Sequence, residues 1–466
     1  MLFLGKLQGF TGDDGYARLG GNRVGVVARE VGNAVKAKNG KTDFMGSANF
    51  ASFPAVRTRR MSNTSRLRSS KEDPNFIQTK KSVKYIFVTG GVISGVGKGI
   101  MAASIGAVIK AKGLRVSIQK CDPYFNVDAG LIDPREHGEC FVLADGAKAD
   151  LDLGHYERFL DEELTGDCTL TSGKLYKKLF DDERAGKFGG KTVQMVPHVT
   201  GLIQQSFVKN VKNFGSDVHI VEVGGTVGDL EQSHFIEAIR EFPNKVGREN
   251  CFYVHVCFVP WLGVGGEWKT KPAQNSLRDL REFGIIPDMV AARVDTEKPR
   301  GTGVIAKKLA VFCGVAEDCV VVMPNVNSVY EVPLNAVKGG VLGPLDRFVD
   351  HGDPDMSGWE ELVGRIARTP KQVVKIGVVG EYVENPDAYL SVVEALKAAG
   401  WELGVGIEIA WGESKGVDGV VVADGACKVS KGVECLRLKG LGHPEFRSRP
   451  MRPHPIFIKF IEKALR

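Results

Sequence analysis

The chain has 466 residues, which is enough for two or three domains, each with its own hydrophobic core. Its composition, 43% hydrophobic and 25% charged, is that of an ordinary globular protein, and no apolar run approaches the ~20 residues of a membrane span. These features exclude an integral membrane protein. Nine cysteines without zinc-type spacing indicate reduced thiols in the cytoplasm.

The net charge of +6 is not spread evenly along the chain. Residues 1–80 carry fourteen Lys/Arg against six Asp/Glu, a charge of +8, so residues 81–466 carry −2 and are not expected to bind nucleic acid. We interpret residues 1–80 as a basic, disordered extension because they lack hydrophobic periodicity. A transit peptide within residues 1–60 is the alternative. Asp13, Asp14 and Glu30 argue against it, since such peptides avoid acidic residues.

Short apolar runs alternate with helical patterns from residue 84 onward. The runs predict strands at residues 85–89, 114–118, 219–223, 252–259, 289–294 and 320–323, and the patterns between them predict helices at 98–112, 200–213, 234–240 and 276–283. This alternation predicts an α/β fold with a doubly wound, mostly parallel sheet of P-loop type. Most of the runs end in polar or glycine-rich sequence, as at residues 120–122, 293–295 and 325–327. Ligands of such sheets bind beyond the carboxyl ends of the strands, so these exits are expected to line one site.

A second α/β unit is predicted after a linker-like stretch at residues 351–371. Strands at 374–379 and 419–423 flank a helix at 391–399. The expected organisation is therefore an extension (1–80), a first α/β domain (81–350), a linker, and a small second α/β domain (372–466).

A glycine-rich loop lies between the first predicted strand and the first predicted helix. In residues 90–99, GGVISGVGKG, the glycines allow backbone N–H groups to wrap phosphate oxygens, and Lys98 is placed to reach the β- and γ-phosphates. A plain glycine-rich turn is the alternative, which the strand–loop–helix context disfavours. Five residues rather than four separate Gly91 from Gly97, and Gly99 stands where a P-loop has the Ser or Thr that ligates Mg²⁺. Any Mg²⁺ here therefore needs ligands from elsewhere.

Two acidic residues are candidates for that ligation. Asp152 lies in the segment DLDLGHY, and Glu222 directly follows an apolar run, where an unpaired charge is costly to bury. Magnesium favours one or two carboxylates together with substrate phosphates. A helix cap or a solvated acid is the alternative for each residue. Both are predicted at strand ends.

Long motifs between residues 85 and 347 resemble the amidoligase domain of CTP synthases. They are YIFVTGGVISGVGKGI, KCDPYFNVDAG, EHGECFV, DLDLGHYERF, QMVPHVT, VEVGGTVGDLE, GEWKTKPAQNS and NVNSVY. The resemblance implies that ATP phosphorylates O4 of UTP, ammonia attacks C4 and phosphate leaves, giving CTP. It implies Mg²⁺ as cofactor, held by Asp152 and Glu222.

The same resemblance implies a role for each matching residue. Lys98, Lys120, Asp152 and Glu222 would be the catalytic set. ATP would be bound by Asp152 and by the loop residues Gly95, Val96, Gly97, Lys98, Gly99 and Ile100. UTP or product CTP would be bound by Ser94, Asp229, Leu230, Glu231, Lys269, Thr270, Lys271, Pro272, Ala273, Gln274 and Lys308. His137, in the EHGE motif, is either a gate for ammonia or a packed structural histidine.

Residues from about 373 resemble the two ends of the family's class I glutamine amidotransferase domain. His443 and Glu445 match its base and orienting partner, but the middle is absent, and neither Cys427 nor Cys435 lies in the G-x-C-x-G elbow of a nucleophile. The expectation is an ammonia-dependent CTP synthase that has lost glutamine hydrolysis in cis, assembled as a homotetramer. The alternative is a nucleotide-binding, non-catalytic subunit or truncated paralogue that assembles with a complete CTP synthase. A carboxylate–amine ligase of the same P-loop group has little support, because KTKPAQ suits a nucleotide.

Overall fold

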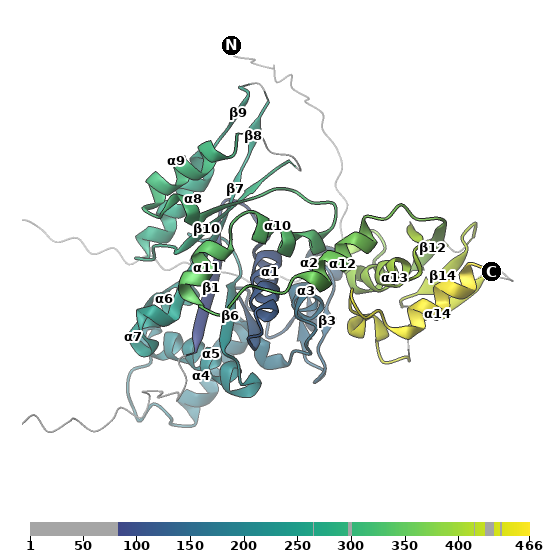
Figure 1. Ribbon diagram of the computed structural model, residues 1–466. Coiled ribbons are helices and arrows are strands. Elements are labelled where there is room, and N and C mark those ends of the chain that lie inside the picture. Colours follow the sequence, from purple (N-terminus) through teal and green to yellow (C-terminus); the bar gives the residue numbers. More distant parts are fainter. Residues whose placement is uncertain (1–82, 264, 297–300, 414, 425–432, 439) are drawn as a thin grey trace, which may run out of the picture. The chain divides into compact units, whose positions relative to one another are not determined.

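The computed structural model describes residues 83–466 except 264, 297–300, 414, 425–432 and 439 (Figure 1). These residues lie within one compact unit, residues 71–466. The expected extension at residues 1–80, with its transit-peptide alternative, lies outside the described residues. The division into domains at residues 350 and 372 stays a prediction. None of the described helices is long and apolar enough to cross a bilayer.

Seven strands form the main sheet in the order β11-β10-β7-β1-β6-β2-β5, and every neighbouring pair is parallel. The strands are β1 (Lys84–Gly90), β2 (Val116–Asp122), β5 (Thr169–Thr171), β6 (Val218–Val223), β7 (Cys251–Val259), β10 (Met289–Val294) and β11 (Val320–Met323). Two short antiparallel hairpins join β3 (Phe141–Val142) to β4 (Lys148–Ala149) and β8 (Trp261–Leu262) to β9 (Glu267–Trp268).

Helices lie in the connections between these strands, and further helices follow β11, the last of them in the chain (Figure 1). They are α1 (Lys98–Ala111), α2 (Pro134–His137), α3 (Leu151–Leu160), α4 (Ser172–Arg184), α5 (Thr200–Phe214), α6 (Ser233–Glu241), α7 (Pro243–Val246), α8 (Lys271–Glu282), α9 (Gly303–Cys313), α10 (Val332–Lys338), α11 (Leu342–Phe348) and α12 (Ser357–Ile366).

Helices cover both faces of the sheet because alternate strand residues point to opposite sides. In β1, Ile86 and Val88 belong to a core shared with α1, α3, α10, α11 and α12, whereas Tyr85 and Phe87 belong to a core shared with α4, α5 and α6. A third cluster packs α8 and α9 on β7 and β10. The predicted fold class, a doubly wound parallel α/β sheet, is confirmed.

A second parallel sheet lies in the C-terminal unit, which we define as residues 372–466. Its order is β13-β12-β14-β15, from β12 (Val373–Val379), β13 (Gly406–Trp411), β14 (Gly419–Val422) and β15 (Glu434–Arg437). The helices α13 (Leu390–Leu403) and α14 (Pro455–Ala464) pack on it through Leu396 and Phe457, which meet Ile376 in one buried cluster.

The largest error in the predicted strands of the main sheet concerns β2. The sequence predicted a strand at 114–118, whereas β2 runs on to Asp122. It continues because the charged side chain of Lys120 is buried among acidic partners rather than turned to water. The three-residue strand β5 was not predicted, since so short a run between polar segments has no distinctive pattern.

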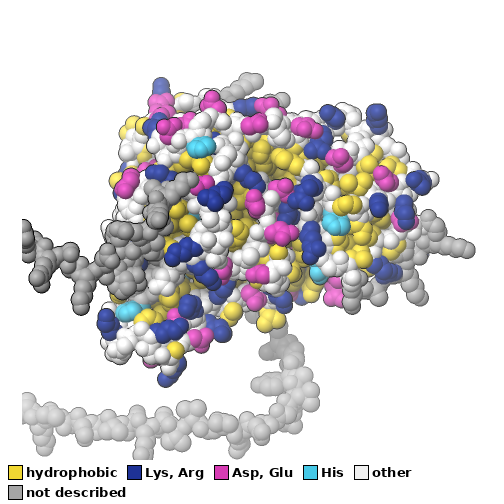
Figure 2. All heavy atoms as spheres, turned by 60° about the horizontal axis from the view of Figure 1, so that its bottom comes forward, with side chains coloured by type: hydrophobic (Ala, Val, Ile, Leu, Met, Phe, Trp, Pro, Cys, Tyr) yellow, Lys and Arg dark blue, Asp and Glu magenta, His cyan; other side chains and the backbone are white. Residues whose placement is uncertain are grey.

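The described surface carries charges of both signs. On the face drawn in Figure 2, Lys/Arg and Asp/Glu side chains are intermixed. This distribution agrees with the nearly balanced charge of residues 81–466.

Candidate functional site

The glycine-rich loop leads from the carboxyl end of β1 into the first turn of α1. Gly95 and Gly97 have φ values of 69° and 98°, a backbone region that glycine enters at little cost. Gly97 is the N-cap of α1 and offers no side-chain cap, so N–H groups of the first turn are free to meet an anion. Arg293, at the end of β10, donates from Nη1 to the carbonyl oxygen of Gly95 at 2.9 Å.

Gly99 occupies the position at which a P-loop has its hydroxyl, and carboxylates fill the space in front of it. A Cβ added to Gly99 would lie 2.6 Å from Oδ1 of Asp152 and 3.2 Å from Oε2 of Glu222. A side chain therefore does not fit there without moving at least one acid. The two predicted metal-ligating residues converge on the place of the missing hydroxyl.

Lys120 holds a cluster of three aspartates together. Its Nζ lies 2.6 Å from Asp152, 3.0 Å from Asp150 and 3.2 Å from Asp122. Burial by itself would lower the pKa of Lys120, but the surrounding carboxylates raise it well above its usual value. Lys120 is therefore a fixed positive charge in this site.

Glu222 is a buried acid at the end of β6, next to Lys120 on β2. Burial, followed by the charge of Asp152, raises the pKa of Glu222 to about 8, and burial raises that of Asp122 to about 6. The hydroxyl of Tyr156 donates to Glu222. A concentration of buried carboxylates with raised pKa values marks a place where a cation binds favourably.

Asp152 and Glu222 are contributed by different kinds of secondary structure. Glu222 lies at a strand end as predicted, but Asp152 does not: it lies in the first turn of α3, where the side chain of Asp150 caps the helix by accepting from the N–H of Asp152 at 2.9 Å. The prediction of a strand end was wrong because the DLDLGHY segment is helical. Packing of α3 against α1 brings this turn to Gly99.

The described residues contain no group of three or more His, Cys, Asp or Glu side chains arranged to hold a metal ion. Asp152 and Glu222 are two carboxylates, which is the number that Mg²⁺ uses when phosphate oxygens and water complete its octahedron. The donor set therefore fits Mg²⁺ bound together with a nucleotide.

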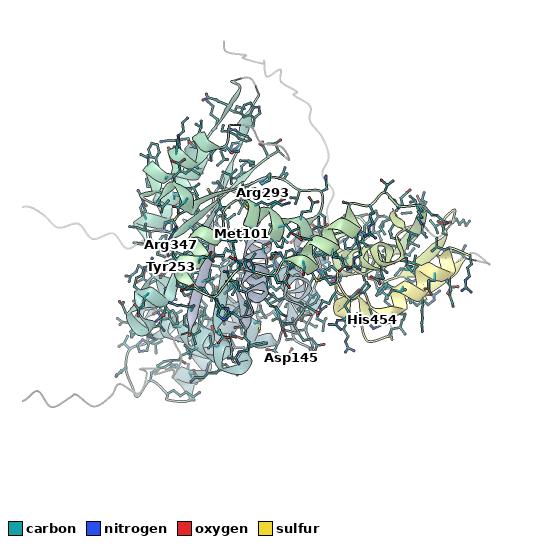
Figure 3. All side chains as sticks on the ribbon, in the orientation of Figure 1. Met101, Asp145, Tyr253, Arg293, Arg347 and His454 are labelled. Atoms are coloured by element: carbon teal, nitrogen blue, oxygen red, sulfur yellow. The ribbon has the colours of Figure 1, made fainter. Side chains whose placement is uncertain are left out.

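A cavity of about 890 Å³ opens beside the loop. Its apolar wall includes Met101 and Val256, and its polar groups include Arg293, Asp295 and Asn325; Figure 3 marks Met101 and Arg293. It is lined by the loop, by Val256 within β7, and by the ends of β10 and β11, so the expectation that strand exits share one site is confirmed for the exits of β10 and β11. The sequence had indicated the exits at 293–295 and 325–327 but had assigned no residue of them to a site.

Buried hydrogen bonds fix α8, which begins at Lys271, beside the loop. His255 of β7 lies 3.0 Å from Oγ1 of Thr89 through Nδ1, and 2.8 Å from Oγ of Ser276 through Nε2. Burial lowers the pKa of His255 to about 3, so the ring is neutral and one nitrogen accepts while the other donates. A Cβ at Gly91 would overlap Ser276 Oγ, which explains the second glycine of the loop.

The residues predicted to bind UTP or CTP lie on several elements near α8. Lys269, Thr270 and the first turn of α8 follow the β8–β9 hairpin. Lys269 forms an ion pair with Glu267 and lowers the pKa of this carboxyl, and the charge of Lys308 on α9 lowers it further. Thr270 accepts from the side chain of Gln274 at 3.0 Å. The segment 229–231 is exposed beyond β6, and Ser94 is exposed in the loop. Their binding roles stay predictions.

His443 and Glu445, the two residues predicted to be a remnant of a glutaminase, contact each other. Nδ1 of His443 lies 2.9 Å from Oε1 of the buried Glu445. Cys435 is an internal residue of β15, not a residue of a strand-to-helix turn. Cys427 lies outside the described residues.

Residues 84–347 match the family model described as the CTP synthase N-terminus. The chain is 48% identical over 358 residues to a CTP synthase of Ruminiclostridium cellulolyticum, covering 74% of this chain and 66% of that protein. It is 44% identical over 356 residues to a CTP synthase of Nostoc punctiforme, covering 73% and 65%. It is 48% identical over 338 residues to one of Carboxydothermus hydrogenoformans, covering 71% and 62%. The chain spans slightly less than two thirds of the length of these relatives.

Proposed function

Because the chain belongs to the CTP synthase family, we propose that it catalyses the ATP-dependent amination of UTP to CTP. In the proposed reaction, O4 of UTP attacks the γ-phosphorus of ATP and ADP leaves. The nitrogen of ammonia then adds to C4, the C4–O4 bond breaks, and O4 leaves as part of inorganic phosphate. N3 of UTP gives up its proton when O4 is phosphorylated, and the added nitrogen loses one proton to become the 4-amino group.

One observation carries the proposal: carboxylate oxygens of Asp152 and Glu222 occupy the space in front of Gly99. In this arrangement two acids replace the absent P-loop hydroxyl beside the N-terminus of α1. Mg²⁺ held by these two acids and by nucleotide phosphates would neutralise charge during phosphoryl transfer.

The two lysines have different tasks in this proposal. Burial lowers the pKa of Lys98, while Glu222 and Asp152 oppose that shift. Lys98, at the first position of α1, binds the ATP phosphates. Lys120 is held on three aspartates, keeps its proton, and stabilises negative charge where ATP and UTP meet.

The segment from Lys269 to Gln274, with Ser94 and Lys308, binds UTP in this proposal, and residues 229–231 contact product CTP. This assignment of the UTP-binding residues is supported by the position of α8, whose Ser276 lies against Gly91 of the phosphate loop. The lysines supply charge-assisted donors to the triphosphate. We further propose assembly as a tetramer.

Free ammonia, or ammonia from a partner glutaminase, is the proposed nitrogen source. His443 and Glu445 are placed as a general base and its orienting acid, but the described residues hold no cysteine nucleophile in a strand-to-helix elbow for them to activate. The alternative of a non-catalytic nucleotide-binding subunit is not favoured, because the amidoligase motifs are intact.

The test is an assay of CTP formation from UTP, ATP and MgCl₂ with either NH₄Cl or glutamine. CTP from NH₄Cl but not from glutamine is expected, and its absence with both would overturn the proposal. Asp152→Asn and Glu222→Gln are each expected to lower the rate with NH₄Cl by at least about 100-fold. Glu162→Gln is the matched control, because Glu162 is an exposed acid that pairs with Lys110 and not with the buried cluster. It is expected to retain the parent rate.

A further inference from the structure

The short helix α2, which ends at His137, is held by residues of the C-terminal unit. The side-chain amide of Asn385 donates to the carbonyl oxygens of Pro134 and Arg135 at 3.0 and 3.2 Å. Within this short helix the carbonyl oxygen of Pro134 also accepts from the N–H of Gly138 at 3.0 Å, and the amide of Asn385 adds a donor from outside the helix. Just past α2, the N–H of Glu139 donates to the carbonyl oxygen of Asp387 at 2.9 Å.

A second set of bonds fixes Glu139 itself. Ser391, in the first turn of α13, donates from Oγ to Oε2 of Glu139 at 2.5 Å and from its N–H to Oε1 at 3.1 Å. Arg158 of α3 donates to the same hydroxyl at 3.1 Å. All three side chains are buried. Breaking this set leaves buried polar groups without partners, which is costly.

The helix held in this way touches the amidoligase cluster. Nε2 of His137 lies 2.8 Å from Oδ2 of Asp150. Asp150 binds Lys120 through its other oxygen at 3.0 Å and caps α3 at Asp152. A continuous path of polar contacts therefore runs from residues 385–391 through His137 to the acids in front of Gly99.

We propose that the C-terminal unit, though it lacks a glutaminase elbow, supports the amidoligase site by positioning His137 through Asn385 and Ser391. His137 acts as a positioning residue for Asp150 and Lys120. This inference rests on the proposed function, and it gives residues 372–466 a task that does not require glutamine hydrolysis.

The variants are chosen to remove single bonds from the full-length chain. Asn385→Asp keeps the side-chain oxygen that caps the 3-10 turn Pro386–Tyr389 but no longer donates to α2. Ser391→Ala removes the hydroxyl and keeps the N–H bond to Glu139. Arg452→Ala is the matched control, because it removes another contact of the C-terminal unit, an exposed ion pair with Asp161, that does not involve α2.

The catalytic readout is CTP synthesis with NH₄Cl, compared through kcat and KM. Asn385→Asp and Ser391→Ala are expected to lower kcat about tenfold with the KM for ATP changed less than twofold, and Arg452→Ala to leave both unchanged. In a His137→Ala background, Asn385→Asp is expected to add no further loss, because both act through one residue. Equal rates in all variants, or multiplicative losses in the double variant, would overturn the inference.

Hydrogen–deuterium exchange of residues 129–139, measured without substrate, gives an independent readout. The two test variants are expected to exchange about tenfold faster there, and the control is expected to match the parent protein. If the parent protein makes no CTP, the proposed function fails, and the exchange measurement still decides the support of α2. Unchanged exchange refutes that support.

Discussion

Replacing Gly99 by alanine tests the idea that carboxylates have taken the place of a P-loop hydroxyl. The new Cβ would lie 2.6 Å from Oδ1 of Asp152, so this oxygen must retreat to the 3.4 Å of ordinary contact. Asp152 is tied to Lys120 at 2.6 Å, so its retreat disturbs the whole cluster. The backbone is no obstacle, because Gly99 is the second residue of α1 and its φ is not positive.

The effects on stability and on rate are expected to separate. Alanine stabilises a helix by about 0.5–1 kcal/mol relative to glycine, whereas overpacking costs about 1–3 kcal/mol, so the free energy of unfolding changes by at most about 2.5 kcal/mol. A displacement approaching 1 Å at the reacting centre costs about 100-fold in rate. The expected result for Gly99→Ala is a folded protein with kcat for ammonia-dependent CTP synthesis reduced about 100-fold.

Initial rates and urea unfolding measure the two effects on the same preparations. Gly364→Ala is the control, because Gly364 is also helical and a Cβ there meets no atom within 4 Å. It is expected to unfold at slightly higher urea with an unchanged rate. A Gly99→Ala variant with the parent kcat would refute the reasoning, since it would show that the position of Asp152 does not matter.

Two further predictions concern stability. Arg449→Met is expected to destabilise the protein by about 3–5 kcal/mol in urea unfolding, because it leaves Glu157, its partner at 2.6 Å, charged and buried; Arg452→Ala, which breaks the exposed pair with Asp161, costs less than about 1 kcal/mol. An equal loss in both variants would contradict this. Burial lowers the pKa of His219 to about 3, so the unfolded chain binds one more proton between about pH 3 and 6.5. Stability from this residue is full above pH ~6.5 and falls by about 1.4 kcal/mol per pH unit as the pH drops. Unfolding at pH 4.5–6 is expected to be less steeply pH-dependent in His219→Gln, and identical slopes would argue against a buried neutral ring.

Much of the fold follows from local patterns. The alternation of apolar runs and helical segments predicted the doubly wound sheet, and five of the six predicted strands of the main sheet agree closely with the structure. These patterns are readable because burial on both faces of a parallel strand demands a continuous apolar run. The glycine-rich phosphate loop could also be predicted from the sequence, because close contact between the backbone and a phosphate leaves no room for side chains.

Part of the candidate site was also visible in the sequence. Glu222 stood out because an acid directly after an apolar run needs a partner, and the structure places it beside Lys120 and in front of Gly99. Asp152 was found through its motif, yet its place was wrong, because the pattern did not show that α3 begins at that point. Of the cavity residues, Arg293 was distinguished in the sequence only by its position at a strand exit, and Met101, which lies in α1, was not distinguished at all.

The sequence by itself determined most strands of the main sheet, the phosphate loop and the need for acids to replace its missing hydroxyl, since each depends on residues close together in the chain. Only the tertiary structure decided which acids meet Lys120 and that Asn385 and Ser391 hold the helix of His137. Those contacts join segments separated by about 30 to 250 residues. Long-range packing, which no local periodicity encodes, selects such partners by filling space and satisfying buried polar groups.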